Sequence, residues 1–394
     1  MRDFLRLVIP TLALLGGQTA SAPAATFGAC IAAMRAEAMA TGVSASTYDT
    51  VTRGLTPNDA GSFLDTQPEF TTPVWDYLAG LVDEERIKDG RTRLRDYAAP
   101  LAAAEKVYGV DRATIVAVWG VESDYGRAIG KRPLAQSLAT LSCEGRRQAY
   151  FRTELFSVMK IIQSGDVPPS ALVGSWAGAF GQTQFMPSTF LRFAVDHDGD
   201  GRRDVVGSVP DALGSTANYL RGSGWQTGLP RGFEVTVPKD YSGPTGRKAK
   251  QSMAHWAGRG VRRVDGQPLG SGAAGLLQPA GPDGPSFLVT SNFDAIFSYN
   301  ASVSYGLAIA HLADRLRGGG PFVTPWPTDD PGLSRAERRE LQTLLSRRGY
   351  DIGPADGAIG EKTRQAIADA QVRAGLPRDG RAGQRVLNLL RSGQ

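Results

Sequence analysis

The stretch Val118-Trp-Gly-Val-Glu-Ser-Asp-Tyr-Gly126 places one carboxylate, that of Glu122, at the end of an apolar run and before a glycine that can stop a helix. Upstream, Asp111 is a residue type that caps helix starts. Ile115 and Val118 share one helical face with Glu122. A carboxylate on an apolar face is costly to ionise, so we expect Glu122 to have a raised pKa and to donate a proton near neutral pH.

This carboxylate, taken alone, allows two interpretations. A Glu at a helix end can cap the helix or pair with an arginine, and such structural pairs also perturb pKa values. Asp124 follows two residues later, roughly 200° around a helix, so it points away and makes a poor second catalytic carboxylate. A single acid without a partner would suit a glycosidase-type site that needs no protein nucleophile.

Further blocks of sequence favour the catalytic interpretation. G-V-E-S-D-Y-G at 120–126, S-L-A-T-L-S at 137–142 and G-S-W-A-G-A-F-G-Q-T-Q-F-M-P-S at 174–188 together resemble the membrane-bound lytic transglycosylase B family. The resemblance runs from about Phe27 to about Leu316. It implies a lysozyme-like core that cleaves peptidoglycan glycan strands, with Glu122 as the catalytic acid/base.

The same resemblance implies the residues of a substrate cleft. Gln184 matches an amide that binds sugar near the acid, and Ser175 is expected near Glu122. Arg146 and Arg147 match a double-arginine pair suited to lactyl or peptide carboxylates. The aromatic hydroxyls expected to line the cleft belong to Tyr219, Tyr299 and Tyr305. The alternatives are core packing for Tyr219 and an ordinary solvated pair for the two arginines.

A lone acid predicts non-hydrolytic cleavage. The C6 hydroxyl of N-acetylmuramic acid can attack its own C1 and form a 1,6-anhydro ring, with effective molarities on the order of 10⁵ M or higher. A hydrolytic muramidase would instead need a second carboxylate, such as Asp124 or Asp211, across the cleft from Glu122. A non-catalytic scaffold that binds peptidoglycan is the other alternative.

Asp196-His-Asp-Gly-Asp-Gly201 reproduces the first half of an EF-hand calcium loop, with carboxylates on Asp196, Asp198 and Asp200. The backbone carbonyl of Arg202 would be the next ligand. The pattern then departs, because position 12 is a glycine, and Asp211 would close a longer loop. The resembled family has a modified calcium loop, which favours a weak structural Ca²⁺ site over an Asp-rich turn. We expect no cofactor to be required for catalysis.

The N-terminus and the overall charge bear on location and partners. Residues 1–25 are typical of a cleaved signal peptide, and the apolar run Leu7–Leu15 is too short to span a bilayer. We expect export to the periplasm as a soluble protein rather than a lipid-anchored one. A net charge of +5 fits an anionic polymer such as peptidoglycan, and no motif supports nucleic acid. The sequence identifies no protein partner.

The chain has two cysteines, Cys30 and Cys143, which in an exported protein form either a disulfide or two buried thiols. No Cys–His or H-E-x-x-H pattern involves the three histidines, which disfavours a peptidase.

The fold class that these patterns predict is mainly α with a small β insertion. Apolar spacing predicts helices over Ile31–Ala40, Val74–Asp89, Leu94–Tyr108, Arg112–Asp124, Arg147–Gln163 and Val209–Gly222. Strands are predicted at Phe233–Val237, Gly275–Gln278 and Phe287–Thr290, inside a β subdomain at about 226–292, before a final core helix, Ser302–Leu316. The catalytic domain would span residues 26–316.

Residues 317–332 are rich in Gly and Pro, a composition that predicts a linker. Beyond it, residues 333–394 contain two D-G-x-x-G turns, Asp356–Gly360 and Asp379–Gly383, before predicted helices at Glu361–Ala374 and Gln384–Leu390. This unit resembles the peptidoglycan-binding type 1 domain, a non-catalytic three-helix module. We expect the linker to separate the module from the cleft, and the module to bind cell wall without contributing to bond cleavage.

Overall fold

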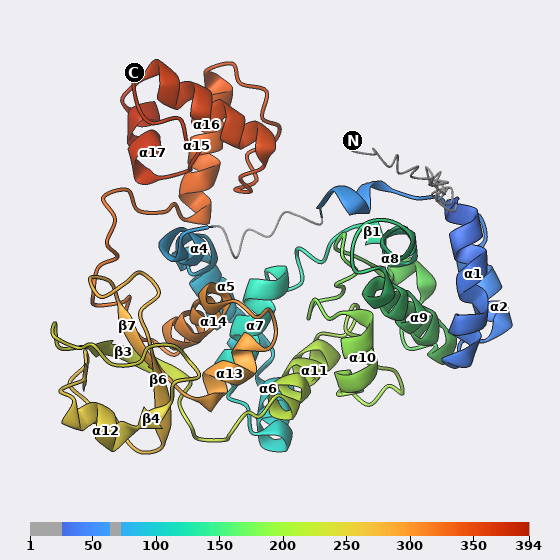
Figure 1. Cartoon of the computed structure of the whole chain (residues 1–394), viewed down its shortest axis with the longest axis horizontal. Coiled ribbons are helices and arrows are strands. Elements are labelled where there is room, and N and C mark those ends of the chain that lie inside the picture. Colours follow the sequence, from blue (N-terminus) through green and yellow to red (C-terminus); the bar gives the residue numbers. More distant parts are fainter. Residues whose placement is uncertain (1–25, 64–71, 394) are drawn as a thin grey trace, which may run out of the picture.

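The computed structural model describes residues 26–63 and 72–393 (Figure 1). It confirms the predicted fold class, mainly helical with small antiparallel sheets. The predicted signal peptide, residues 1–25, lies outside the described residues.

Helix α7 (Arg112–Ser123) is the centre of one hydrophobic cluster. Its predicted cap forms, because the Asp111 side chain accepts a hydrogen bond from the Thr114 amide at 3.0 Å. The helices that pack around α7 are α5 (Glu84–Asp96), α6 (Ala98–Tyr108), α11 (Val209–Gly222) and α14 (Val303–Leu316). Since Ile115 and Val118 are fully buried, α7 can place Glu122 at its end with little freedom to move.

A second cluster of helices lies beside the first (Figure 1). It contains α1 (Phe27–Ala40), α2 (Ala45–Thr52), α8 (Leu134–Cys143), α9 (Gln148–Ser164) and α10 (Pro187–Phe193), together with the short helices η1 (Asp59–Phe63) and η2 (Pro169–Ala171). The two-residue strands β1 (Arg132–Pro133) and β2 (Val173–Gly174) pair antiparallel at its edge. A disulfide joins Cys30 of α1 to Cys143 of α8. Of the two alternatives left open by the sequence, a disulfide or two buried thiols, the structure therefore has the disulfide.

One predicted helix is two helices in the structure. Val74–Asp89 divides into α4 (Val74–Leu81) and α5, which continues to Asp96, so the helix predicted from Leu94 begins only at Ala98. The break occurs because Asp83 is extended and its side chain accepts from the Arg86 amide at 2.8 Å. The Arg86 guanidinium in turn donates to the carbonyls of Gly80 and Leu81 at the end of α4. A capping preference therefore prevails over continuous helical periodicity.

The predicted β subdomain forms a five-stranded antiparallel sheet in the order β4-β6-β7-β3-β5. The three predicted strands are β3 (Gly232–Thr236), β6 (Ala273–Leu277) and β7 (Ser286–Val289), each within two residues of its expected bounds. Around this sheet, the elements that the sequence did not predict are β4 (Gln251–Ser252), α12 (Met253–Gly258), β5 (Arg262–Arg263) and α13 (Ser291–Phe297), which are all short.

The C-terminal module contains α15 (Arg335–Arg347), α16 (Glu361–Arg373) and α17 (Gln384–Arg391). Its two D-G-x-x-G turns are held in the same way. Gln342 accepts from the Gly357 amide and donates to Asp356, and Gln371 accepts from the Gly380 amide and donates to Asp379. The internal repeat in the sequence is thus a repeat of hydrogen bonds.

The sequence predicts that the linker separates this module from the cleft. In the structure the linker does not hold the module away from the core. Glu234 of β3 accepts hydrogen bonds from the amides of Val323 and Thr324, at 2.8 and 2.7 Å. Phe322 stacks on His311 of α14 with ring centroids 3.9 Å apart. The linker is therefore packed along the β subdomain and α14, and it delivers α15 to the end of α4 (Figure 1).

Candidate active site

Glu122 occupies the last turn of α7, where it is half-buried. Tyr305, in the first turn of α14 after the N-cap Ser302, donates its hydroxyl to Glu122 Oε1. Burial, with the nearby charge of Glu122, raises the pKa of the Tyr305 phenol well above its ordinary value. Tyr305 therefore stays protonated and acts as a donor to the carboxylate at every working pH.

The three predicted tyrosines form a continuous series. The ring centroids of Tyr305 and Tyr299 are 6.2 Å apart, and those of Tyr299 and Tyr219 are 4.6 Å apart. Burial, followed by the charge of Glu122, also raises the pKa of Tyr299 well above its usual range. The hydroxyls of Tyr299 and Tyr219 donate to backbone carbonyls of Thr183 and Ser298, at 2.9 and 2.8 Å.

Gln184 lies in the loop that Tyr299 holds through the Thr183 carbonyl. Its backbone adopts φ +50°. Its side-chain Nε2 donates to the backbone carbonyls of Gly181 and Ile129 at 2.8 and 3.2 Å. The neighbouring Gln182 was not singled out in the sequence, although it binds the loop to α7. It accepts from Trp119 Nε1 at 3.0 Å, and its carbonyl accepts from the Ser123 hydroxyl at 2.7 Å.

The remaining predicted substrate residues lie in the second helical cluster. Ser175 follows β2, where its hydroxyl accepts from the Ala179 amide at 3.0 Å. Arg146 and Arg147 precede α9 and are both exposed. The Arg147 guanidinium stacks on Tyr150, 4.4 Å from the ring centroid. Their roles toward a substrate stay predictions.

The two carboxylates that a hydrolytic site would require are engaged elsewhere. Asp124 caps the end of α7 in a left-handed conformation and forms ion pairs with Arg86, Arg127 and Arg335. Asp211 is fully buried and accepts from the amides of His197, Asp198 and Asp204. Neither geometry resembles a base that faces Glu122.

A groove of about 670 Å³ opens over Glu122. Residues of the core form one side of it, namely Tyr77 and Gly80 of α4, Val121, Glu122, Asn300 and Tyr305. Residues of the C-terminal module form the other side, among them Arg338, Arg364 and Arg381. Sequence reasoning missed this second side. Asn300 had a local signal, because it lies inside the Tyr299–Tyr305 motif, whereas the arginines had none.

Part of the predicted calcium loop converges. Carboxylate oxygens of Asp196, Asp198 and Asp211 all lie within 4.8 Å of one another. Asp200 is not part of this group, since its carboxylate pairs with the Arg202 guanidinium at 2.9 Å. Three converging carboxylates suit a hard divalent cation such as Ca²⁺.

None of the helices within residues 26–63 and 72–393 is both long and apolar enough to cross a membrane.

Two family models match the chain. Residues 26–314 match the transglycosylase SLT domain, and residues 334–390 match the putative peptidoglycan binding domain. The first of these covers more than half of the chain.

Individual relatives agree with these matches. Membrane-bound lytic murein transglycosylase B of Escherichia coli is 34% identical over 275 residues, which are 68% of this chain and 74% of that protein. The crystal structure of SltB3 from Pseudomonas aeruginosa in complex with NAG-anhNAM-pentapeptide is 46% identical, with a TM-score of 0.74, over 93% of this chain and 99% of that one. The Escherichia coli lytic transglycosylase Slt35 in complex with calcium is 30% identical, with a TM-score of 0.64, over 74% of this chain and 92% of that one. The chain therefore belongs to the SLT-domain lytic transglycosylase family and carries a C-terminal peptidoglycan-binding domain.

Proposed function

We propose that Glu122 is the single acid/base with which this peptidoglycan lytic transglycosylase cleaves the β-1,4 bond between N-acetylmuramic acid and N-acetylglucosamine. The observation that carries the proposal is the Glu122 carboxyl in the groove, hydrogen-bonded by the buried Tyr305. The other two candidate carboxylates, those of Asp124 and Asp211, are engaged by other groups.

The reaction needs no water. Glu122 gives its proton to the glycosidic oxygen as the bond from that oxygen to C1 of the muramic acid breaks. The 2-acetamido oxygen stabilises the positive charge at C1. The C6 hydroxyl then attacks C1, and its proton returns to Glu122. The products are a free 4-hydroxyl on one strand and a 1,6-anhydro-N-acetylmuramic acid end on the other.

The test compares Glu122→Gln with Glu144→Gln, which alters an exposed glutamate at the end of α8. We expect Glu122→Gln to lower the rate of sacculus lysis by about 10²–10⁴-fold, as for loss of a general acid, and Glu144→Gln to leave it unchanged. Mass spectrometry of the wild-type digest should show anhydro ends, which are one water lighter than reducing ends. Lysis at the wild-type rate by Glu122→Gln would disprove the role of Glu122, and reducing ends alone would identify a hydrolase.

We also propose that Asp196, Asp198 and Asp211 bind a structural Ca²⁺, with Asp200 and the Arg202 carbonyl as further ligands if Asp200 releases its ion pair. The convergence of three carboxylates supports this, as does the calcium in the related Slt35 structure. Calcium should raise the melting temperature of the wild-type protein and not that of Asp196→Asn. Isothermal titration that detects no binding of Ca²⁺ to the wild type would rule the site out.

We propose, finally, that the chain is exported to the periplasm after cleavage within residues 20–25. The disulfide between Cys30 and Cys143 supports an oxidising compartment. Mass spectrometry of the mature protein from fractionated cells tests both the cleavage and the location.

A further inference from the structure

We propose that the C-terminal module completes the active-site groove, and that its Arg364 and Arg338 bind a carboxylate of the glycan strand that Glu122 cleaves. This inference rests on the proposed role of Glu122. It assigns to a module expected only to bind cell wall a direct part in recognising the substrate at the site of cleavage.

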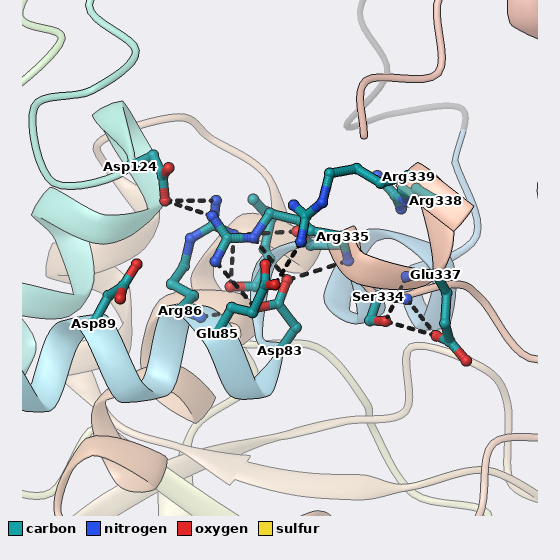
Figure 2. Close-up of polar contacts among 12 residues, drawn as sticks. Asp83, Glu85, Arg86, Asp89, Asp124, Ser334, Arg335, Glu337, Arg338 and Arg339 are labelled. Carbon is teal, nitrogen blue, oxygen red and sulfur yellow. Dashed lines mark hydrogen bonds and ion pairs between the residues drawn. The ribbon is translucent and has the colours of Figure 1, made fainter. Parts of the chain in front are cut away.

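The module is docked by charged contacts between α15 and the core (Figure 2). Arg335 of α15 pairs with Asp83, which is 6% exposed, at 2.8 Å and with Asp124 at 2.7 Å. Arg339 pairs with Glu85. Arg86 adds a second cation between the same carboxylates and is itself 5% exposed.

A second docking contact lies at the second D-G-x-x-G turn, Asp379–Gly383. Arg381 donates two hydrogen bonds to the Asp76 carboxylate, at 2.6 and 2.7 Å, and pairs with Asp330 at the end of the linker. Gly332 lies so close to α4 that a Cβ there would be 2.7 Å from the Asp76 Cα. The first turn carries Ala358 where the second carries Arg381, so the second turn is specialised for docking.

This docked position turns three arginines of the module toward the groove that contains Glu122. Arg381 is neutralised by Asp76 and Asp330. Among the described residues, by contrast, no carboxylate forms an ion pair with Arg338 or Arg364. Arg338 donates to the Asp76 carbonyl at 3.2 Å, while its buried Nε has no partner. Arg364 is exposed on α16.

Two unneutralised guanidinium groups facing a groove favour an anionic ligand. A glycan strand of peptidoglycan carries carboxylates either on its stem peptides or, where the peptide has been removed, on the lactyl group of muramic acid. Both sources present the same chemistry to an arginine. Arg338 is fixed by close packing against Gly80, where a Cβ would be 2.4 Å from its guanidinium. The exposed Arg364 is therefore the better residue to test.

The experiment uses the full chain with Arg364→Gln and, as a matched control, Arg347→Gln. Arg347 is an exposed arginine in the last turn of α15 and does not line the groove. Three substrates are compared: glycan strands with stem peptides, strands stripped of peptide, and peptide-bearing strands whose carboxyl groups have been converted to methylamides. Release of anhydro ends is followed to obtain kcat and KM for each.

We expect Arg364→Gln to lower kcat/KM about tenfold on carboxylate-bearing strands, mainly through KM, as for loss of one charge-assisted hydrogen bond. The wild type should fall to the level of the variant on the methylamide strands. A loss confined to peptide-bearing strands assigns the stem peptide, and a loss that persists on stripped strands assigns the lactyl group.

The proposal is overturned if Arg364→Gln has no effect on carboxylate-bearing strands, or if it lowers activity equally on the methylamide strands. An equal loss in Arg347→Gln would also overturn it, because the effect would then be one of general charge. Failure of the proposed role of Glu122 is distinguishable, since Glu122→Gln would then retain activity whatever the arginine variants show.

Discussion

The position of the Glu122 carboxylate depends on how α7 ends. Asp124 and Tyr125 adopt left-handed conformations, with φ of 49° and 59°, and they turn the chain back on the helix. The Tyr125 ring then packs on Gly120 and on Trp119, and its hydroxyl donates to the Arg86 carbonyl at 2.8 Å. Gly120 therefore leaves the space in which the aromatic ring of Tyr125 packs against the helix.

Gly120→Ala should destabilise the protein by about 1–3 kcal/mol, as for overpacking of a core. A Cβ at Gly120 would be 2.7 Å from the Tyr125 ring, which is buried and cannot easily move. Gly28→Ala in α1 is the control, because a Cβ there meets nothing within 4 Å. Urea unfolding measures both. An unchanged midpoint for Gly120→Ala would mean that the ring has room to shift.

Tyr305→Phe should change the pH dependence of catalysis. The phenol stays protonated because its pKa is raised well above its ordinary value, so it stabilises the ionised form of Glu122 by donating to it. Without this donor the carboxylate is less stable, and the acid form of Glu122, which starts the reaction in the proposed mechanism, persists to higher pH. We expect the alkaline limb of the kcat/KM profile to move up by about one unit.

The control for this shift is Tyr219→Phe, whose hydroxyl donates to the Ser298 carbonyl instead. It should leave the alkaline limb where it is, even if it lowers the rate. A limb that moves in neither variant, or moves equally in both, would show that Tyr305 does not tune Glu122.

Individual helices and strands could be predicted where one sequence signal, such as a capping residue or an apolar periodicity, dominates. The Asp111 cap and the apolar face of α7 were both correct, and α11 was predicted with its observed bounds. The break between α4 and α5 was missed because Asp83 and Arg86 stop a helix whose apolar pattern continues. The short elements around β4, α12 and β5 contain too few residues to show a period.

The pairing of α1 with α8 through Cys30 and Cys143 should contribute substantially to stability. The disulfide closes a loop with a sequence separation of 113, and the loss of chain entropy for a loop of that size corresponds to about 4–5 kcal/mol. We expect the double variant Cys30→Ser/Cys143→Ser to unfold at a clearly lower guanidinium concentration. It should still cleave glycan, because α7 belongs to the other cluster. Equal unfolding midpoints with and without the disulfide would contradict the prediction.

The arrangement of the two domains was beyond the reach of the sequence. Family motifs nominate Glu122 and the tyrosines around it as candidate site residues, since these residues lie in continuous blocks of sequence. The second side of the groove, however, depends on docking by pairs such as Arg335 with Asp83, which are 252 residues apart. The module has many arginines, and no local pattern distinguishes the docking ones from those left facing the groove. The three-dimensional arrangement, with a packed linker and a docked α15, is needed to tell the arginines that dock the module from those that face the groove (Figures 1 and 2).

The docking should be insensitive to pH until the solution becomes strongly acidic. Burial opposes ionisation of Asp83, but its hydrogen bonds with Arg335 and with the Arg86 amide outweigh this and lower its pKa below the ordinary 3.8. A lowered pKa means that the contact is at full strength above that value and is lost as pH falls through the lower one. Small-angle scattering should give a constant radius of gyration from pH 8 to 5. Expansion near neutrality would contradict this.

Arg335→Glu should undock the module and weaken catalysis together. The new carboxylate would lie beside Asp83 and Asp124, so attraction becomes repulsion in a site where breaking one buried pair costs about 3–5 kcal/mol. The linker, released from its packing, should become a site of limited proteolysis within residues 317–332. Because the groove would lose the arginines of its second side, kcat/KM on short glycans should fall as well. Arg347→Glu makes the same charge change away from the contact and should alter neither result. Full activity in an undocked Arg335→Glu protein would show that the module serves only to bind cell wall.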